Sequence, residues 1–290
     1  MIQDHSFTPV FDRFRPTATS FIVTIYGDVV VPRGGVLWMG DLIALCAGAG
    51  ISETLVRTAV SRLVAAGQLS GERRGRRSYY SLAAPARQEF DDAAARLFGP
   101  VPGRSDWVIL HAPGLADDAA RRRGYGAMGA GNFLLPGWMA AGAVPGPEPA
   151  QAFRADAISP PLALAARLWE LDALAADYRE MLALFAPALR AASLAPPGGA
   201  EALRLRLALV HSFRRILLRD PQLPPDSLPE GWRGAEARAV FARLYTLLSG
   251  AADSFIGARL EGLDGPLPAE NEITRARLAG LAAIAGPADD

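Results

Sequence analysis

The chain has 290 residues, half of them hydrophobic, which is enough to bury a sizeable core and suggests two or three domains rather than one. Thirty basic residues balance thirty acidic residues, so the molecule as a whole has no field that would hold a polyanion, and any nucleic-acid site must be a local patch. No apolar stretch has the length of a signal peptide or a membrane span, and we expect a cytoplasmic protein without a membrane partner. The single cysteine, Cys46, excludes an internal disulfide, and its apolar neighbours predict a small core residue.

Proline and glycine breaks at residues 99–103 and 159–161 divide the chain into three stretches. We predict an α+β protein with domains at residues 1–98, 104–158 and 162–290. The central domain is expected to open with a buried strand at 107–110, followed by a helix at 115–123. The last domain is expected to be all-helical, with helices at 162–185, 200–218 and 235–248 and weaker ones to the end.

Helix and strand signals alternate in the first stretch. An apolar run predicts a helix at 18–31, and a short strand at 36–39 and a helix at 41–49 follow it. Ser52 is placed to cap a helix over 53–66, which stops at Gly67. After it, the sequence predicts a β-hairpin with strands at 68–73 and 77–82 and a closing helix at 85–98. This succession predicts a winged helix-turn-helix over residues 17–98.

The polar face of the 53–66 helix carries the chemistry that base recognition needs. A helix of about four turns fits the major groove, where Arg presents two donors to guanine and Ser or Thr contacts a base edge or a phosphate. The residues assigned to DNA contact are Thr54, Arg57, Thr58, Ser61 and Arg62. An ordinary solvated helix face would carry similar residues, so this helix alone leaves both interpretations open.

The predicted hairpin is strongly basic. Residues 51–87 contain seven Arg against two Glu, which gives a local charge of +5 in a neutral protein. A basic wing adds affinity by lying along the phosphate backbone or in the minor groove, and we assign to it Arg73, Arg74, Arg76, Arg77 and Tyr79. Tyr79 and Tyr80 alternate on the strand, so one of the two is expected to pack on the core. An RNA-binding loop or a merely solubilising loop is the alternative.

Three motifs stand out in this stretch: VVVPRGG at 29–35, LVRTAVSRLV at 55–64 and GERRGRRSYY at 71–80. They resemble the PaaX family of bacterial repressors, and residues 168–178 and 209–224 are also similar to that family. The resemblance implies an N-terminal winged helix-turn-helix, a central ferredoxin-like α+β domain and a helical C-terminal domain. It further implies a homodimer that binds double-stranded operator DNA.

The resemblance also implies repression of a phenylacetate degradation operon and release from the operator by phenylacetyl-CoA. Residues 124–133 and 139–150 depart from the family's pattern, so a related acyl-CoA is an alternative effector. A CoA thioester needs Arg donors beside an apolar pocket. The candidates for its site are Arg122, Arg123, Tyr125, His211, Arg214 and Arg215, with a solvated charge run or an interhelix salt bridge as the alternative for each.

We predict a regulator with neither a cofactor nor a metal, rather than an enzyme. The sequence has no Ser-His-Asp ordering, P-loop or zinc-ligand spacing, and the predicted strand at 107–110 is followed by His111 instead of a carboxylate pair. Two alternatives stay open. One is a nucleic-acid-processing enzyme that uses the central domain, and the other is a regulator controlled by a protein partner.

Overall fold

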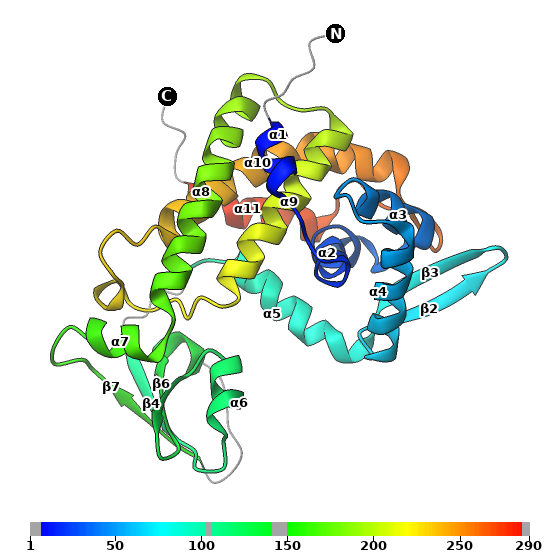
Figure 1. Ribbon diagram of the computed structural model, residues 1–290. Coiled ribbons are helices and arrows are strands. Elements are labelled where there is room, and N and C mark those ends of the chain that lie inside the picture. The colour runs from blue at the N-terminus through cyan, green and yellow to red at the C-terminus, as the bar shows by residue number, and fades with distance from the viewer. Residues whose placement is uncertain (1–6, 102–105, 141–149, 286–290) are drawn as a thin grey trace. The chain divides into compact units, whose positions relative to one another are not determined.

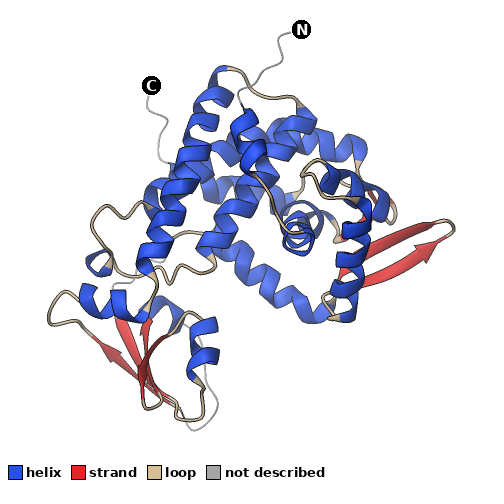
Figure 2. Cartoon of the chain, in the orientation of Figure 1, coloured by secondary structure: helices blue, strands red, loops and turns tan. Residues whose placement is uncertain are grey.

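The computed structural model describes residues 7–101, 106–140 and 150–285, and the chain folds as two compact units (Figures 1 and 2). Unit 1 comprises Met1–Pro100, Met181–Arg214 and Glu236–Asp290, and unit 2 comprises Val101–Glu180 and Arg215–Ala235. Both contain helices and antiparallel strands, which confirms the α+β class. Within the described ranges, no helix combines the length and the apolar character needed to cross a bilayer.

The N-terminal part of unit 1 places helices around a three-stranded antiparallel sheet of order β1-β3-β2. Its helices are α1 (Thr8–Arg13), α2 (Ala18–Ile25), α3 (Met39–Ala47), α4 (Glu53–Ala65) and α5 (Arg87–Phe98), and its strands are β1 (Val36–Trp38), β2 (Leu69–Arg74) and β3 (Arg77–Leu82). The helix predicted at 18–31 continues past α2 as a π-helical segment and a 3₁₀ turn that ends at Arg33. Cys46 is fully buried, as predicted, and burial raises the pKa of its thiol to about 12.

Long helices from the C-terminal half complete unit 1. They are α8 (Leu171–Leu194), α9 (Gly199–Leu217), α10 (Gly234–Arg259) and α11 (Glu272–Ala285), and the short strands β8 (Glu261–Gly262) and β9 (Gly265–Pro266) join α10 to α11. Both α8 and α9 continue into unit 2 at one end. The helix predicted at 235–248 was too short, because α10 keeps burying apolar side chains as far as Ile256.

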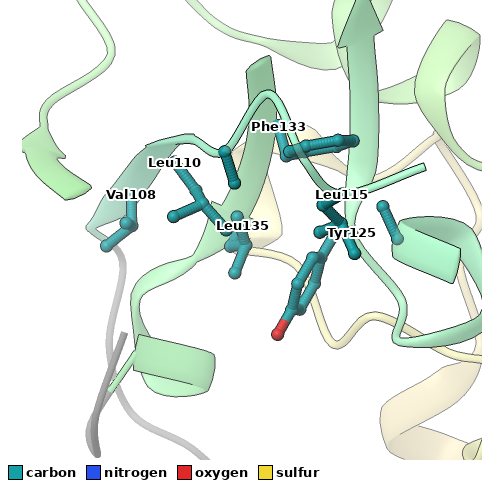
Figure 3. Packing of buried hydrophobic residues seen from close by; sticks show 8 residues of the cluster. Val108, Leu110, Leu115, Tyr125, Phe133 and Leu135 are labelled. Carbon is teal, nitrogen blue, oxygen red and sulfur yellow. The ribbon is translucent and has the colours of Figure 1, made fainter. Parts of the chain in front are cut away.

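Unit 2 is built on a four-stranded antiparallel sheet of order β5-β6-β4-β7. Its strands are β4 (Trp107–His111), β5 (Gly126–Gly129), β6 (Asn132–Pro136) and β7 (Gln151–Ala155), and its helices include α6 (Asp117–Arg122) and α7 (Leu162–Leu168). One face of the sheet packs into an apolar core that includes Leu110 of β4, Phe133 of β6 and Tyr125 (Figure 3). The sequence predicted β4 and the helix after it but missed β5, β6 and β7.

The prediction of one helix over 162–185 was wrong, because the backbone is extended at Trp169 and separates α7 from α8. The indole N–H of Trp169 donates to the carbonyl of Gly124 over 2.9 Å, and its ring lies 6.1 Å from that of Trp107. A side chain on Gly126 would place its Cβ 2.9 Å from the Trp169 ring, so the glycine-rich segment allows this close approach. Tertiary packing therefore ends a helix that periodicity alone would extend.

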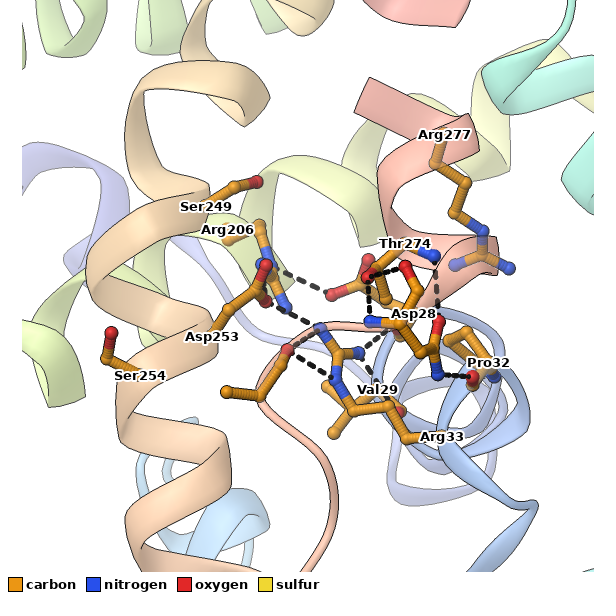
Figure 4. A network of polar contacts seen from close by, with 12 residues as sticks. Asp28, Val29, Pro32, Arg33, Arg206, Ser249, Asp253, Ser254, Thr274 and Arg277 are labelled. Atoms are coloured by element: carbon orange, nitrogen blue, oxygen red, sulfur yellow. Dashed lines mark hydrogen bonds and ion pairs between the residues drawn. The ribbon is translucent and has the colours of Figure 1, made fainter. Parts of the chain in front are cut away.

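A buried ionic network joins the N-terminal part of unit 1 to α9 and α10 (Figure 4). Arg206 of α9 donates to Asp28 Oδ2 over 3.0 Å and to Asp253 Oδ1 over 2.6 Å. Arg33 donates to the same Asp253 oxygen over 2.6 Å, and the Tyr245 hydroxyl donates to Asp28 Oδ1 over 2.8 Å. Two arginines thus balance two carboxylates at positions that are almost completely buried.

The two arginines of this network are shifted in opposite directions, and burial, with the charge of Arg206 added to it, lowers the pKa of Arg33. Burial acts to lower the pKa of Arg206, but the negative charges of Asp28 and Asp253 outweigh it and raise that pKa above its ordinary value. Arg33 also donates to the carbonyls of Asp28 and Val29, so its side chain binds the backbone of the π-helical segment that precedes it. The VVVPRGG motif therefore supplies a cation that orders the local backbone and holds α10.

Replacing Arg206 with Ala leaves two buried carboxylates without the cation they share. We expect the free energy of unfolding to fall by about 3–5 kcal/mol, measured by urea unfolding. Arg204 is a matched control, because it is an exposed arginine on the same helix whose guanidinium lies 3.7 Å from the centroid of the Phe11 ring. Arg204→Ala is expected to cost less than about 1 kcal/mol, and equal losses for both variants would contradict the assignment.

Candidate nucleic-acid interface

Helix α4 presents one polar face to solvent. It follows the turn at Gly50, where φ is +76°, and it buries Val56, Val60 and Leu63 among its apolar residues. The five α4 residues that the sequence assigned to DNA contact are all exposed: Thr54, Arg57, Thr58, Ser61 and Arg62. Ser52 occupies the expected N-cap position, but its side chain makes no capping hydrogen bond. The amphipathic pattern thus determines which face of α4 is exposed to solvent and free to contact a ligand.

A left-handed glycine ends α4 and directs the chain into β2. At Gly67 φ is +67°, its N–H donates to the carbonyl of Val64, and the N–H of Gln68 donates to that of Leu63. These two bonds form a Schellman cap, which satisfies carbonyls that the helix end would otherwise leave unpaired. The direction in which the basic hairpin (residues 69–82) leaves α4 is set at this point.

The pleat divides the arginines of the basic hairpin between two faces. Strands β2 and β3 pair in the register Glu72↔Tyr79, Arg73↔Ser78 and Arg74↔Arg77. Because side chains alternate along a strand and paired residues share a face, Arg73 lies on the same face as Ser78 and Tyr80. Arg74 and Arg77 lie on the opposite face, and all four arginines from 73 to 77 are exposed.

A groove of about 440 Å³ lies between α4 and the basic hairpin. Its lining includes Arg57, Ser61 and Val64 from α4 and Arg73, Ser78 and Tyr80 from the hairpin. Tyr79, which the sequence assigned to DNA contact, is only 8% exposed, whereas Tyr80 faces the groove. The expected division between one core tyrosine and one surface tyrosine is found, with Tyr79 as the buried member.

A second groove, of about 410 Å³, flanks α4 on another side. Arg62 and Thr58 line it from α4, and Arg15 and Thr17 line it from the segment that enters α2. Leu55 contributes an apolar side chain that is 56% exposed. The exposed face of α4 is therefore bordered by donors on both sides.

Several of the exposed arginines are held by carboxylates. Arg57 pairs with Glu53 one turn earlier over 2.8 Å, and Arg74 pairs with Glu72 over 2.9 Å and with Asp264 over 3.3 Å. Arg77 pairs with Glu261, and its guanidinium lies 4.5 Å from the centroid of the Trp38 ring. A hydrogen bond with Tyr79 and the charge of Glu261 raise the pKa of Arg77.

The sequence analysis did not identify the two carboxylates from the far end of the chain. Glu261 and Asp264 lie in a short segment after α10 with no motif of its own, and they come within reach of the hairpin only through the fold. Their sole local signal is an acidic residue on each side of Gly262-Leu263. Local sequence therefore overstates the charge that the hairpin offers to a ligand.

The six effector candidates divide between the two units. His211 and Arg214 lie in unit 1, while Arg122, Arg123, Tyr125 and Arg215 lie in unit 2. His211 Nδ1 lies 3.0 Å from Thr24 Oγ1, with Phe14 and Phe21 edge-on to its ring, and Arg214 donates to the carbonyl of Ser20. Tyr125 is buried in the core of unit 2, whereas Arg122 and Arg123 are exposed at the end of α6. Their role in effector binding stays a prediction.

Within residues 7–101, 106–140 and 150–285, no cluster of three or more His, Cys, Asp or Glu residues has an arrangement that could hold a metal ion.

Comparison with known proteins identifies the family. Residues 17–86 match the family described as PaaX-like protein, and residues 169–258 match the PaaX-like protein C-terminal domain. The chain belongs to this PaaX-like family, which confirms the resemblance carried by its motifs.

Among its relatives is the transcriptional repressor PaaX of Escherichia coli strain K12, which is 32% identical over an alignment covering 91% of each protein. A solved structure of an uncharacterized protein from Mycobacterium tuberculosis is 25% identical, with a TM-score of 0.46. That match covers 82% of this chain and 98% of the other.

The glycine cap of α4 can be tested against a second glycine. Nothing lies within 4 Å of a Cβ built on Gly67, so Gly67→Ala should cost about 1–2 kcal/mol of unfolding free energy through its left-handed backbone alone. Gly250 is exposed inside α10 with equally open surroundings, and Gly250→Ala should add about 0.5–1 kcal/mol. Urea unfolding of both variants measures the difference, and two changes of the same sign would refute the backbone argument.

Proposed function

We propose that this protein is a cytoplasmic transcriptional repressor that binds double-stranded operator DNA through a winged helix-turn-helix at residues 17–98. In this proposal α4 is the recognition helix and the basic hairpin is the wing. The observation that carries it is the groove between them, which brings Arg57 and Ser61 of α4 beside Arg73 and Tyr80 of the hairpin. Membership of the PaaX-like family, which includes a transcriptional repressor, supports the same function.

The dimensions of α4 suit the major groove. Its 13 residues span about 20 Å, and its apolar side is held on the core, so it approaches DNA with its polar face. Arg57 and Arg62 supply paired donors of the kind that recognise guanine, and Thr54, Thr58 and Ser61 supply hydroxyls for bases or phosphates. Base reading is therefore assigned to α4, and phosphate contact chiefly to Arg73 and Arg76, the exposed arginines of the hairpin for which the described structure shows no carboxylate partner.

Arginines on α4 and on the hairpin are expected to act differently. Arg57→Ala or Arg62→Ala should cost about 1–3 kcal/mol on a selected operator and relax base preference. Arg73→Ala or Arg76→Ala should weaken binding to all DNA alike and reduce the slope of log K against log salt by about 1. Fluorescence anisotropy with the operator and with random duplex measures both quantities.

Arg275→Ala is the control for loss of one positive charge, since Arg275 is exposed on α11, outside the proposed interface. The division of roles fails if the α4 and hairpin variants lose equal affinity on the operator and on random DNA.

The proposed active form is a homodimer with a ferredoxin-like central domain. The β4-α6-β5-β6 succession and the strand order β5-β6-β4-β7 support that domain, because a ferredoxin-like sheet places its first and third strands at the centre.

A dimer would bind an imperfect palindrome with half-sites one helical turn or a multiple apart. The mass measured by sedimentation, with and without such DNA, tests it.

The repressed genes are proposed to belong to an aromatic catabolic operon for phenylacetate, with phenylacetyl-CoA or a related acyl-CoA as the releasing effector. The family resemblance supports this assignment, and the candidate contacts are the six residues named above. An effector releases DNA only if it binds the DNA-free form more tightly than the bound form.

Titrating phenylacetyl-CoA, CoA and phenylacetate separately into the protein–operator complex tests this control. We expect release by the thioester but not by free phenylacetate. If no thioester dissociates the complex, the effector assignment is wrong while the DNA-binding assignment stands.

A further inference from the structure

The short hairpin of β8 and β9 (residues 261–266, the acidic hairpin) is fixed against the sheet of the N-terminal part. Asp41 Oδ2 at the start of α3 accepts a hydrogen bond from the Glu261 N–H over 2.7 Å. A Cβ on Gly262 would lie 3.4 Å from the Val36 carbonyl, so this backbone runs close along β1. The acidic hairpin is thus anchored through its own backbone, at Glu261 by the Asp41 carboxylate and at Gly262 by its close approach to β1.

The carboxylates reach Arg74 and Arg77, which lie on the face of the basic hairpin opposite Arg73 and are not among the residues that line the α4 groove. Glu261 pairs with Arg77, and Asp264 lies 3.3 Å from Arg74, which also pairs with Glu72. Arg77 is further held over the Trp38 ring. Arg73, on the other face, makes no such ion pair in the described structure, where its Nε donates to the carbonyl of Gly75.

The two carboxylates of the acidic hairpin cancel a large share of the positive charge around the basic hairpin. Residues 51–87 carry a charge of +5 by sequence, and including the two carboxylates of the acidic hairpin reduces it to +3. Those carboxylates bind guanidinium groups as DNA phosphates do, and they repel phosphates that approach the same place. Arg74 and Arg77 are therefore engaged before any DNA arrives.

We propose that Glu261 and Asp264 are specificity-determining residues of DNA binding, because they withhold Arg74 and Arg77 from the phosphate backbone and keep the basic hairpin aligned with α4. This inference rests on the proposed DNA-binding function. With two arginines withheld, the affinity for DNA of arbitrary sequence falls, because that affinity depends on phosphate contacts. The fixed alignment preserves operator affinity, which depends on α4 and Arg73 acting together.

The test is the double variant Glu261→Gln, Asp264→Asn. Its matched control is Glu270→Gln, Glu272→Gln, which removes the same charge from exposed positions nearby that make no ion pair in the described structure. The probes are random duplex DNA and an operator selected from a random pool by the wild-type protein. Each Kd is measured by anisotropy across a series of salt concentrations.

For the double variant we expect random DNA to bind at least about threefold more tightly near 0.1 M salt, with a salt slope steeper by up to about 2. Operator affinity should change less, so the ratio of operator to random affinity falls. The control should leave slope and ratio close to wild type. If the double variant behaves like the control, or the ratio does not fall, the inference is overturned.

Two further measurements keep the result interpretable. Asp264 is 89% exposed at its side chain, so the single variant Asp264→Asn provides the same slope test should the double variant fail to fold. The wild-type protein itself tests the underlying function. If it selects no DNA from the pool, the proposed function fails, whereas selection with unaltered behaviour of the variants removes only the role of the acidic hairpin.

Discussion

Arg206 lies fully buried between Asp28 and Asp253, and the arrangement of unit 1 depends on this contact. A lone buried charge would be strongly unfavourable, so the three elements that carry these residues are stable only when they meet. Arg33 donates to the same oxygen of Asp253 as Arg206, and the Tyr245 hydroxyl donates to the second oxygen of Asp28. The segment before β1 is thereby joined to α9 and α10. This connection also positions the sheet, which begins at β1 directly after that segment.

The same arrangement brings the acidic hairpin to the basic one. Asp253 lies on α10, which ends two residues before Glu261, so the network that holds α10 also places the carboxylates that engage Arg74 and Arg77. Helices that lie far from α4 in the sequence thus influence the charge available beside it. Under the proposed function, DNA affinity would therefore be a property of the whole unit and not of residues 17–98 alone.

The proposed control by an effector needs a physical link between the proposed ligand site and the proposed DNA-binding face, and contacts within unit 1 would supply one. His211 and Arg214 of α9 contact α2, whose neighbouring helix α4 carries the proposed recognition face. Helix α9 also carries Arg206, so a shift along this helix would disturb both the ionic network and the support of α4. Coupling of this kind requires two arrangements with different ligand affinities.

The sequence by itself determined the elements whose signals are local. Helical periodicity defined the exposed face of α4, and glycine ended the helix at Gly67, because both depend on neighbours within a few residues. Only the tertiary structure decided the break at Trp169, the partner of Arg77 at Glu261 and the burial of Tyr79. Asp28 and Arg206 are 178 positions apart, and no local preference encodes their pairing, since a buried charge acquires its partner only when the distant elements pack.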